Sequence, residues 1–185
     1  MADDLDAETK LKIYTLILSR YKDTINQNES RSISEIRQKV SPYSEYIKKL
    51  RDRLLYDLNP YDPERSFLTA AERSIAYIRG VRTCEFAFNF WMSFDEIESL
   101  KIASALDKAM LLAALLRAIG SEDARVLVTK KGKVFVRYGW KGIVYLFNPQ
   151  TDTLSSGGDS LGIFSDDPLA SSFNDLVYDN FEDED

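Results

Sequence analysis

The stretch SALDKAMLLAALLRAIGSEDARVLVT, residues 104–129, predicts a buried helix that leads directly into a strand. Ser104 and Asp107 have the spacing of a helix N-cap and its reciprocal partner. The run 109–116 is apolar on every side, so this helix should lie inside the core rather than on the surface. Gly120 can adopt the left-handed conformation that commonly ends a helix. We therefore expect this helix to be the centre of the fold.

Three strand-like runs follow the helix, at residues 124–129, 133–138 and 143–147. Each run is rich in β-branched and aromatic residues, and glycine-containing turns separate them, which predicts an antiparallel meander. The chain before the buried helix has mostly helical patterns. We therefore expect an α+β fold, in which a buried central helix packs on an antiparallel sheet and a helical extension precedes this core.

Changes in composition divide the chain into three regions. Residues 1–58 form a helical N-terminal region, and the turn-rich segment NPYDPE at 59–64 separates it from the expected core, residues 59–150. Residues 151–185 form an acidic tail, because the last basic residue of the chain is Lys141. Such a tail either keeps the protein in solution or docks on a basic surface of its own body or of a partner.

Two segments have the apolar spacing of an amphipathic helix. The first lies near the N-terminus and places five residues on one stripe: Leu11, Tyr14, Leu18, Tyr21 and Ile25. The second lies in the tail at 168–181, begins after a capping Asp167, and places Leu169, Phe173, Leu176 and Val177 on one face. We expect the second helix to pack onto the body of the chain or into the groove of a partner.

Composition excludes several kinds of chemistry. The chain contains no histidine and one cysteine, Cys84, so no Ser-His or Cys-His nucleophile, no internal disulfide and no cysteine-rich zinc site can form. We expect neither a cofactor nor a metal ion. The net charge is −6, and no apolar run is long enough to span a bilayer. The simplest interpretation is a cytoplasmic protein that does not contact a membrane.

The order of motifs resembles the transglutaminase-like superfamily, a branch of the papain-like fold. The resemblance covers about residues 68–150 and rests on a buried helix ending in LLRAIG, the strand that begins ARV, and the strand that ends in Asn-Pro. In that family the helix begins Gly-x-Cys-x-Asp, a later strand carries the catalytic histidine, and a further strand ends in Asp-Pro. The resemblance implies a papain-like core with a substrate groove at the start of the buried helix.

All three catalytic positions of the family are replaced in this chain. The nucleophile position falls on Ala105, the histidine position falls at or near Val134, and the aspartate position falls on Asn148. The resemblance therefore implies a catalytically inactive member rather than an enzyme. It further implies a binding module that holds a protein segment or a small ligand in the former substrate groove.

Four residues near the former catalytic positions are candidate ligand contacts: Trp91, Asp107, Tyr138 and Asn148. Each also has a structural interpretation. Asp107 completes a helix cap, and Asn148 before a proline forms a turn. The aromatic group Phe86, Phe88, Phe90, Trp91 and Phe94 lines a ligand slot or simply packs the core, and Cys84 is a relocated nucleophile or a buried thiol.

Two other classes of function stay open. A hydrolase or transferase with chemistry unrelated to the family would use carboxylates such as Asp57, Asp62 or Asp107, although their spacing suggests no pair. A nucleic-acid recognition domain would use the basic helix expected at 42–58, with Tyr43 and Tyr46, although the acidic net charge makes nucleic acid an unfavourable partner. The oligomeric state cannot be derived from the sequence.

Overall fold

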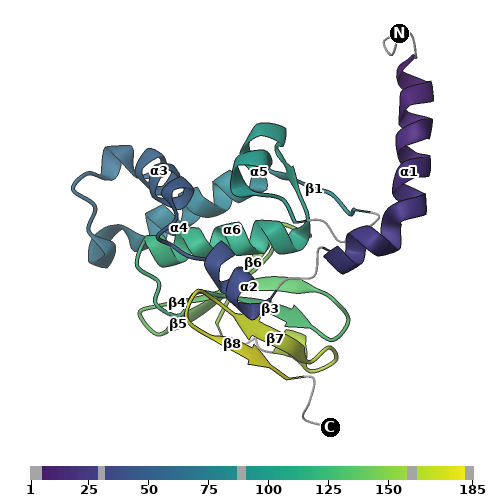
Figure 1. Cartoon of the computed structure of the whole chain (residues 1–185). Coiled ribbons are helices and arrows are strands. Elements are labelled where there is room, and N and C mark those ends of the chain that lie inside the picture. The colour runs from purple at the N-terminus through teal and green to yellow at the C-terminus, as the bar shows by residue number, and fades with distance from the viewer. Residues whose placement is uncertain (1–5, 29–31, 87–90, 158–161, 182–185) are drawn as a thin grey trace. The chain divides into compact units, whose positions relative to one another are not determined.

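The computed structural model describes four stretches of the chain: residues 6–28, 32–86, 91–157 and 162–181. The contacts between residues divide the chain into two compact units, Met1–Arg31 with Phe86–Trp91, and Ser32–Glu85 with Met92–Asp185. The described residues combine helices with an antiparallel sheet, which confirms the α+β class (Figure 1).

The first unit contains one long helix, α1 (Ala7–Asn28). The carboxylate of Asp6 accepts hydrogen bonds from the backbone N–H and the hydroxyl of Thr9, so it satisfies a free donor of the first turn. The large apolar side chains of this helix that the structure describes are exposed. Helix α1 confirms the helix that the apolar spacing near the N-terminus predicts.

The second unit contains the remaining helices: α2 (Ile33–Lys39), α3 (Glu45–Leu54), the 3-10 helix η1 (Tyr56–Leu58), α4 (Pro63–Arg79), α5 (Phe94–Leu100) and α6 (Ala105–Ala118). Capping boxes begin α2 and α5, where Ser32 and Ser93 bond reciprocally with the glutamates three residues later. Asp62 caps α4, and Pro63 occupies its first turn, where no N–H partner is needed.

The main sheet has six strands: β3 (Arg125–Thr129), β4 (Val134–Trp140), β5 (Ile143–Asn148), β6 (Thr153–Ser156), β7 (Leu169–Phe173) and β8 (Tyr178–Asn180). Strands β3 to β6 form consecutive antiparallel hairpins, which confirms the predicted meander. Strand β7 then returns to pair with the other side of β3, so the order across the sheet is β6-β5-β4-β3-β7-β8.

Helix α6 is the centre of this unit. It packs on β3 and β4 of the sheet and against α3 and α4 on its other side (Figure 1). All residues from Asp107 to Leu116 are buried, including the charged Lys108. The expectation of a buried central helix is confirmed, because only a helix covered on both sides can bury apolar residues around its whole circumference.

The end of α6 shows why Gly120 follows this helix. Its φ is +108°, and the backbone N–H groups of Gly120 and Ser121 donate to the carbonyls of Arg117 and Leu116. These two bonds form a Schellman motif, which satisfies carbonyls that the helix leaves free. A side chain at position 120 would be strained in this conformation, so glycine is required for the sharp exit toward β3.

The predicted helix at 168–181 is wrong, because the segment folds as the hairpin of β7 and β8. Asn174 makes the turn: its side-chain oxygen accepts bonds from the N–H groups of Leu176 and Val177. Asp167 caps no helix, and its carboxylate instead accepts from the Thr129 hydroxyl and the Lys131 N–H. Pairing with β3 on one side and β8 on the other supplies hydrogen bonds that override the helical spacing.

Acidic residues of the last region bind basic residues of the rest of the unit. Four ion pairs join them: Asp152 with Lys108, Asp167 with Lys133, Asp175 with Arg117, and Asp179 with Arg125. The region after Lys141 therefore forms part of the sheet and contacts the basic body through its carboxylates.

Candidate functional site

The start of α6 is where the resemblance places a nucleophile. A short parallel pair, β1 (Arg82–Thr83) with β2 (Ile102–Ala103), leads into this helix. Ala105 is its first residue and is half-buried. The hydroxyl of Ser104 caps the helix by accepting from the Asp107 N–H, at 3.0 Å. The first turn of α6 therefore presents a methyl group, and no nucleophile, at position 105.

Asp107 is engaged in contacts within the protein. Its carboxylate is 2 % exposed and accepts a 2.7 Å hydrogen bond from Lys39 Nζ and another, also 2.7 Å, from the Ser104 hydroxyl. Lys39 also donates to the Met92 carbonyl, at 2.7 Å, and lies 5.9 Å from the centre of the Phe94 ring. The ammonium group of Lys39, at the end of α2, therefore covers the carboxylate of Asp107, which was a candidate ligand contact.

Lys108 makes a second buried ionic contact at the same end of α6. Its side chain is 1 % exposed, and Nζ donates to the Thr83 hydroxyl at 3.0 Å and to Asp152 at 3.1 Å. Thr83 in turn donates to the carbonyl of Pro149. These bonds join the first turns of α6 to the loop that follows β5, so the fold brings together the segments that carry Ala105 and Asn148.

The other positions of the expected triad have structural roles. Val134 is buried at the start of β4. The side-chain oxygen of Asn148 accepts from the N–H groups of Gln150 and Thr151, at 2.8 and 3.3 Å, so Asn148 forms the turn after β5. The turn interpretation of Asn148 is confirmed, and this bonding occupies the oxygen that a ligand would need.

The structure describes four of the aromatic candidates, Phe86, Trp91, Phe94 and Tyr138. Tyr138 is buried and stacks on Tyr145, with ring centres 4.9 Å apart, and burial raises its pKa above the ordinary value. Phe94 is buried beside Tyr46. Trp91 belongs to the first unit and is described only there. Phe88 and Phe90 lie outside the described residues.

Cys84 and the alternative carboxylates also have structural contacts. The N–H of Cys84 donates to the Ala103 carbonyl, and the half-buried thiol lies 3.7 Å from the Glu85 carbonyl. Asp57 pairs with Arg73, and the hydrogen bonds from Arg73 lower the pKa of that carboxyl. Asp62 caps α4. The structure shows no pairing among Asp57, Asp62 and Asp107 for acid–base chemistry, because each contacts a separate partner.

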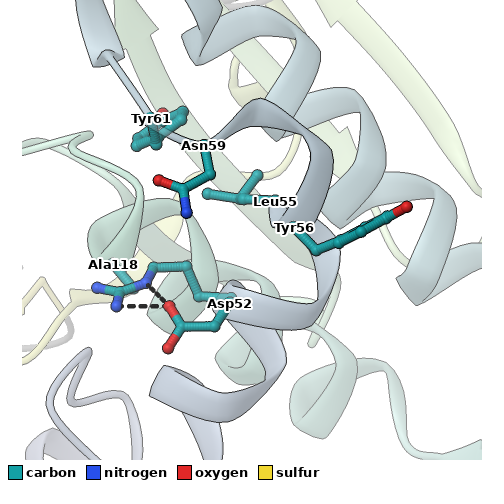
Figure 2. Close-up of a pocket in the computed structure, with 7 residues that line it drawn as sticks. Asp52, Leu55, Tyr56, Asn59, Tyr61 and Ala118 are labelled. Atoms are coloured by element: carbon teal, nitrogen blue, oxygen red, sulfur yellow. Dashed lines mark hydrogen bonds and ion pairs between the residues drawn. The ribbon is translucent and has the colours of Figure 1, made fainter.

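Two adjoining pockets lie at the other end of α6, and we call them together the α3–α6 groove. The smaller has a volume of about 250 Å³ and is lined by Arg51, Asp52, Leu55, Tyr56, Asn59, Tyr61 and Ala118 (Figure 2). The larger has a volume of about 490 Å³ and is lined by Pro42, Tyr43, Lys48, Arg51, Arg117, Ala118, Gly120, Glu122 and Leu176. Ala118 lies 13 residues after Ala105, about 20 Å along the helix axis.

The α3–α6 groove combines cations with exposed aromatic and apolar side chains. Tyr43, Tyr56 and Leu176 are all strongly exposed at its edge. Arg117 pairs with Asp175, and Arg51 pairs with its neighbour Asp52 (Figure 2). Lys48 makes no ion pair or hydrogen bond within the described part of the chain. The sequence indicated Tyr43 and the cations of α3, but not the side chains from η1, the end of α6 and the β7–β8 turn.

The basic face expected on the helix at 42–58 is largely neutralised. The helix is shorter than predicted, since α3 begins at Glu45 after a capping Ser44. Lys49 pairs with Glu45, and Arg53 pairs with Glu98 at 2.6 Å. Tyr46 is half-buried, and its hydroxyl lies 3.0 Å from that of Tyr77. Few of these groups are therefore free to contact a phosphate backbone.

Tyr61, which lines the groove, carries a pH-dependent contribution to stability. Its hydroxyl donates to the Ile119 carbonyl at 2.8 Å. Burial raises the pKa of Tyr61 from 10.0 to about 12, and the charge of Asp62 adds to the increase. Between these values the unfolded chain loses the phenolic proton while the folded chain keeps it, so stability falls as the pH rises through this range.

We therefore expect Tyr61→Phe to make the free energy of unfolding less dependent on pH above pH 10. The measurement is urea unfolding at a series of alkaline pH values. Tyr43→Phe is the control, because Tyr43 is strongly exposed. Equal pH slopes for the Tyr61 variant and the unchanged protein would show that this phenol has no raised pKa.

Comparison with known proteins leaves the chain without an assigned family. No family model matches it, and no curated protein or solved structure matches it either. Among the described residues, no group of three or more cysteine, aspartate or glutamate side chains is arranged to hold a metal ion. None of the described helices is both long and apolar enough to cross a membrane.

Proposed function

We propose that this protein is a non-catalytic domain of transglutaminase-like fold that acts as a binding module for a protein segment or a small ligand. The observation that carries the proposal is the chemistry of the first turn of α6. Position 105 is an alanine, and the adjacent Asp107 is covered by Lys39. A chain without histidine offers no imidazole to activate a nucleophile at this turn.

The arrangement of segments supports the fold assignment. A buried helix packs on an antiparallel sheet, and the start of that helix is bonded to the loop after β5 through Thr83 and Lys108. The resemblance places the nucleophile position, Ala105, and the aspartate position, Asn148, on these two segments. A cytoplasmic location belongs to the proposal, because a chain with one unpaired thiol suits a reducing compartment.

The α3–α6 groove is the binding surface that we assign to the module. Lys48 is exposed and unpaired within the described residues, and Arg51 lies three residues later on the same helix. Tyr43 and Tyr56 provide large rigid contact surfaces of the kind that dominate binding energy at protein interfaces. A short peptide with acidic and apolar side chains would complement this combination.

Peptide-display selection on the full-length protein tests this assignment. We expect enrichment of short acidic peptides, and Lys48→Glu should weaken binding of an enriched peptide by about tenfold or more, since it reverses a charge at the binding surface. Lys49→Glu is the matched control. It is the same change on the next residue, but Lys49 pairs with Glu45 and does not line the groove.

Two outcomes would contradict the proposal. Equal weakening by the Lys48 and Lys49 variants would show that general charge, rather than the groove, binds the peptide. Turnover of thioester, ester or peptide substrates that disappears in an Asp107→Ala protein shown by circular dichroism to be folded would show that the protein is an enzyme. Nucleic acid is the weaker alternative, and a low-salt titration with single- and double-stranded oligonucleotides tests it because such binding strengthens as salt falls.

A further inference from the structure

Helix α1 carries large apolar side chains that are exposed. Leu11 is 64 % exposed, Tyr14 is 61 % exposed and Tyr21 is 53 % exposed, and Ile17 and Leu18 beside them are also exposed. Ile13 and Leu16 are exposed too, but they lie on the outer face of the helix, away from this stripe. Single exposed apolar residues are ordinary on proteins, but a continuous apolar stripe along one helix usually marks an interaction site. Charged residues occupy other positions of the helix, among them Glu8, Lys12 and Lys22.

The spacing of this stripe is that of a coiled coil. Leu11, Tyr14, Leu18 and Tyr21 are separated by three, four and three residues, so they occupy the a and d positions of a heptad repeat. Ile17 lies directly beside this seam at a g position and widens it. A 22-residue helix is about 33 Å long, which spans three heptads. Isolated helices of this length are marginal in water, so packing against another helix would stabilise α1.

We propose that α1 pairs with α1 of a second copy of this chain in an antiparallel two-helix coiled coil. In the antiparallel register, Leu11 packs against the partner's Tyr21, and Tyr14 packs against the partner's Leu18. Every layer then combines one leucine with one tyrosine, and Ile17 faces the partner's Ile17. The interface is self-complementary, as a two-fold symmetric dimer requires.

The charges that flank the seam favour this direction. In the antiparallel register Glu8 lies opposite the partner's Lys22, and the two-fold axis repeats this pair at the other end of the interface. Glu8 and Lys22 are both exposed in the isolated chain, where Glu8 also pairs with Lys12 one turn along the same helix. A parallel register would instead place Ile17 opposite the partner's Lys22 and leave Glu8 without a cation across the interface. Pairs of this kind set the orientation of coiled coils.

Engineered disulfides in the full-length chain test the register. Cys84 is first replaced by serine, because it is the only cysteine in the chain. Leu11→Cys and Tyr21→Cys proteins are then mixed and oxidised. We expect disulfide-linked heterodimers in the mixture and little linkage in either protein alone. Two Leu11 positions would lie about 15 Å apart along the antiparallel pair, well beyond the reach of a disulfide.

Sedimentation velocity of full-length variants tests the interface itself. Leu18→Glu should weaken dimerisation by about tenfold or more, because it places a charge in the apolar seam. Leu16→Glu is the matched control, since Leu16 is exposed on the outer face of the same helix. Glu8→Lys should also weaken the dimer, and adding Lys22→Glu should restore it.

Several results would overturn the inference. Linkage of the Leu11→Cys protein with itself would show a parallel pair. A monomer at all concentrations would show that α1 does not bind a second copy. Either of two alternatives, packing of α1 on its own chain or binding of α1 to vesicles of anionic phospholipid, would then account for its apolar stripe. The inference concerns the first unit alone, so it stands or falls independently of the function proposed for the α3–α6 groove.

Discussion

Asp107→Ala is expected to lower the free energy of unfolding by about 3–5 kcal/mol, since it breaks a buried ion pair by removing one partner. The carboxylate is 2 % exposed, and it neutralises Lys39, whose side chain is 17 % exposed. Without Asp107 the ammonium of Lys39 would lose its most deeply buried counter-charge, although it would keep its contacts with the Met92 carbonyl and the Phe94 ring and would remain in the field of the exposed Glu96. Urea unfolding followed by circular dichroism measures the change.

Glu96→Ala is the matched control for this variant. Glu96 occupies the same position in the cap of α5 that Asp107 occupies in the cap of α6, three residues after a capping serine. Glu96 also interacts with Lys39, but its side chain is exposed and solvent screens that interaction, so its removal should cost only about 1 kcal/mol. Equal effects of the two variants would show that Asp107 contributes only as a capping residue. A small effect together with altered ligand binding would instead show that Asp107 is a binding residue.

Asp175→Ala is expected to destabilise the protein by about 3 kcal/mol for a related reason. Asp175 and Arg117 have side chains that are 6 % and 10 % exposed, and they make two hydrogen bonds of 2.7 and 3.3 Å. This pair joins the β7–β8 turn to the last turn of α6. Arg117 would retain its bonds to the carbonyls of Ser121 and Glu122, so the guanidinium would not be left entirely without partners.

The control for this pair is Glu45→Ala. Glu45 pairs with Lys49 on α3, but both side chains are more than three-quarters exposed. An exposed pair four residues apart on a helix contributes about 0.3–0.5 kcal/mol. Asp175→Ala should also alter the α3–α6 groove, because the adjacent Leu176 lines it. If Asp175→Ala proved as mild as Glu45→Ala, the turn would not depend on this ion pair.

The buried helix could be predicted from the sequence because its signals are local. A capping serine, an apolar run and a terminal glycine act within one or two turns of each other. The start of α4 is harder to predict from the sequence. Thr69 and Glu72 have the spacing of a capping box but lie in the middle of the helix, whose cap is Asp62 before Pro63. Both patterns satisfy the rules for a helix start, and packing of Phe67 in the core selects the longer helix.

The tail shows where local signals fail. Leu169 and Phe173 have helical spacing, yet they lie at the two ends of β7. This segment pairs with the side of β3 that β4 leaves open, and β3 lies about forty residues earlier in the chain. A sequence pattern does not contain the hydrogen bonds that a distant strand offers. The segment therefore forms a strand in spite of its helical spacing.

The sequence alone determined the mixed helical and sheet composition, the central position of α6, the meander of β3 to β5, and the absence of any histidine. Only the tertiary structure decided that Lys39 covers Asp107, that Asn148 bonds its own turn, and that a groove opens at the far end of α6. Elements form from neighbours in the chain, whereas the burial of a charge and the shape of a pocket depend on side chains that packing brings together from distant segments.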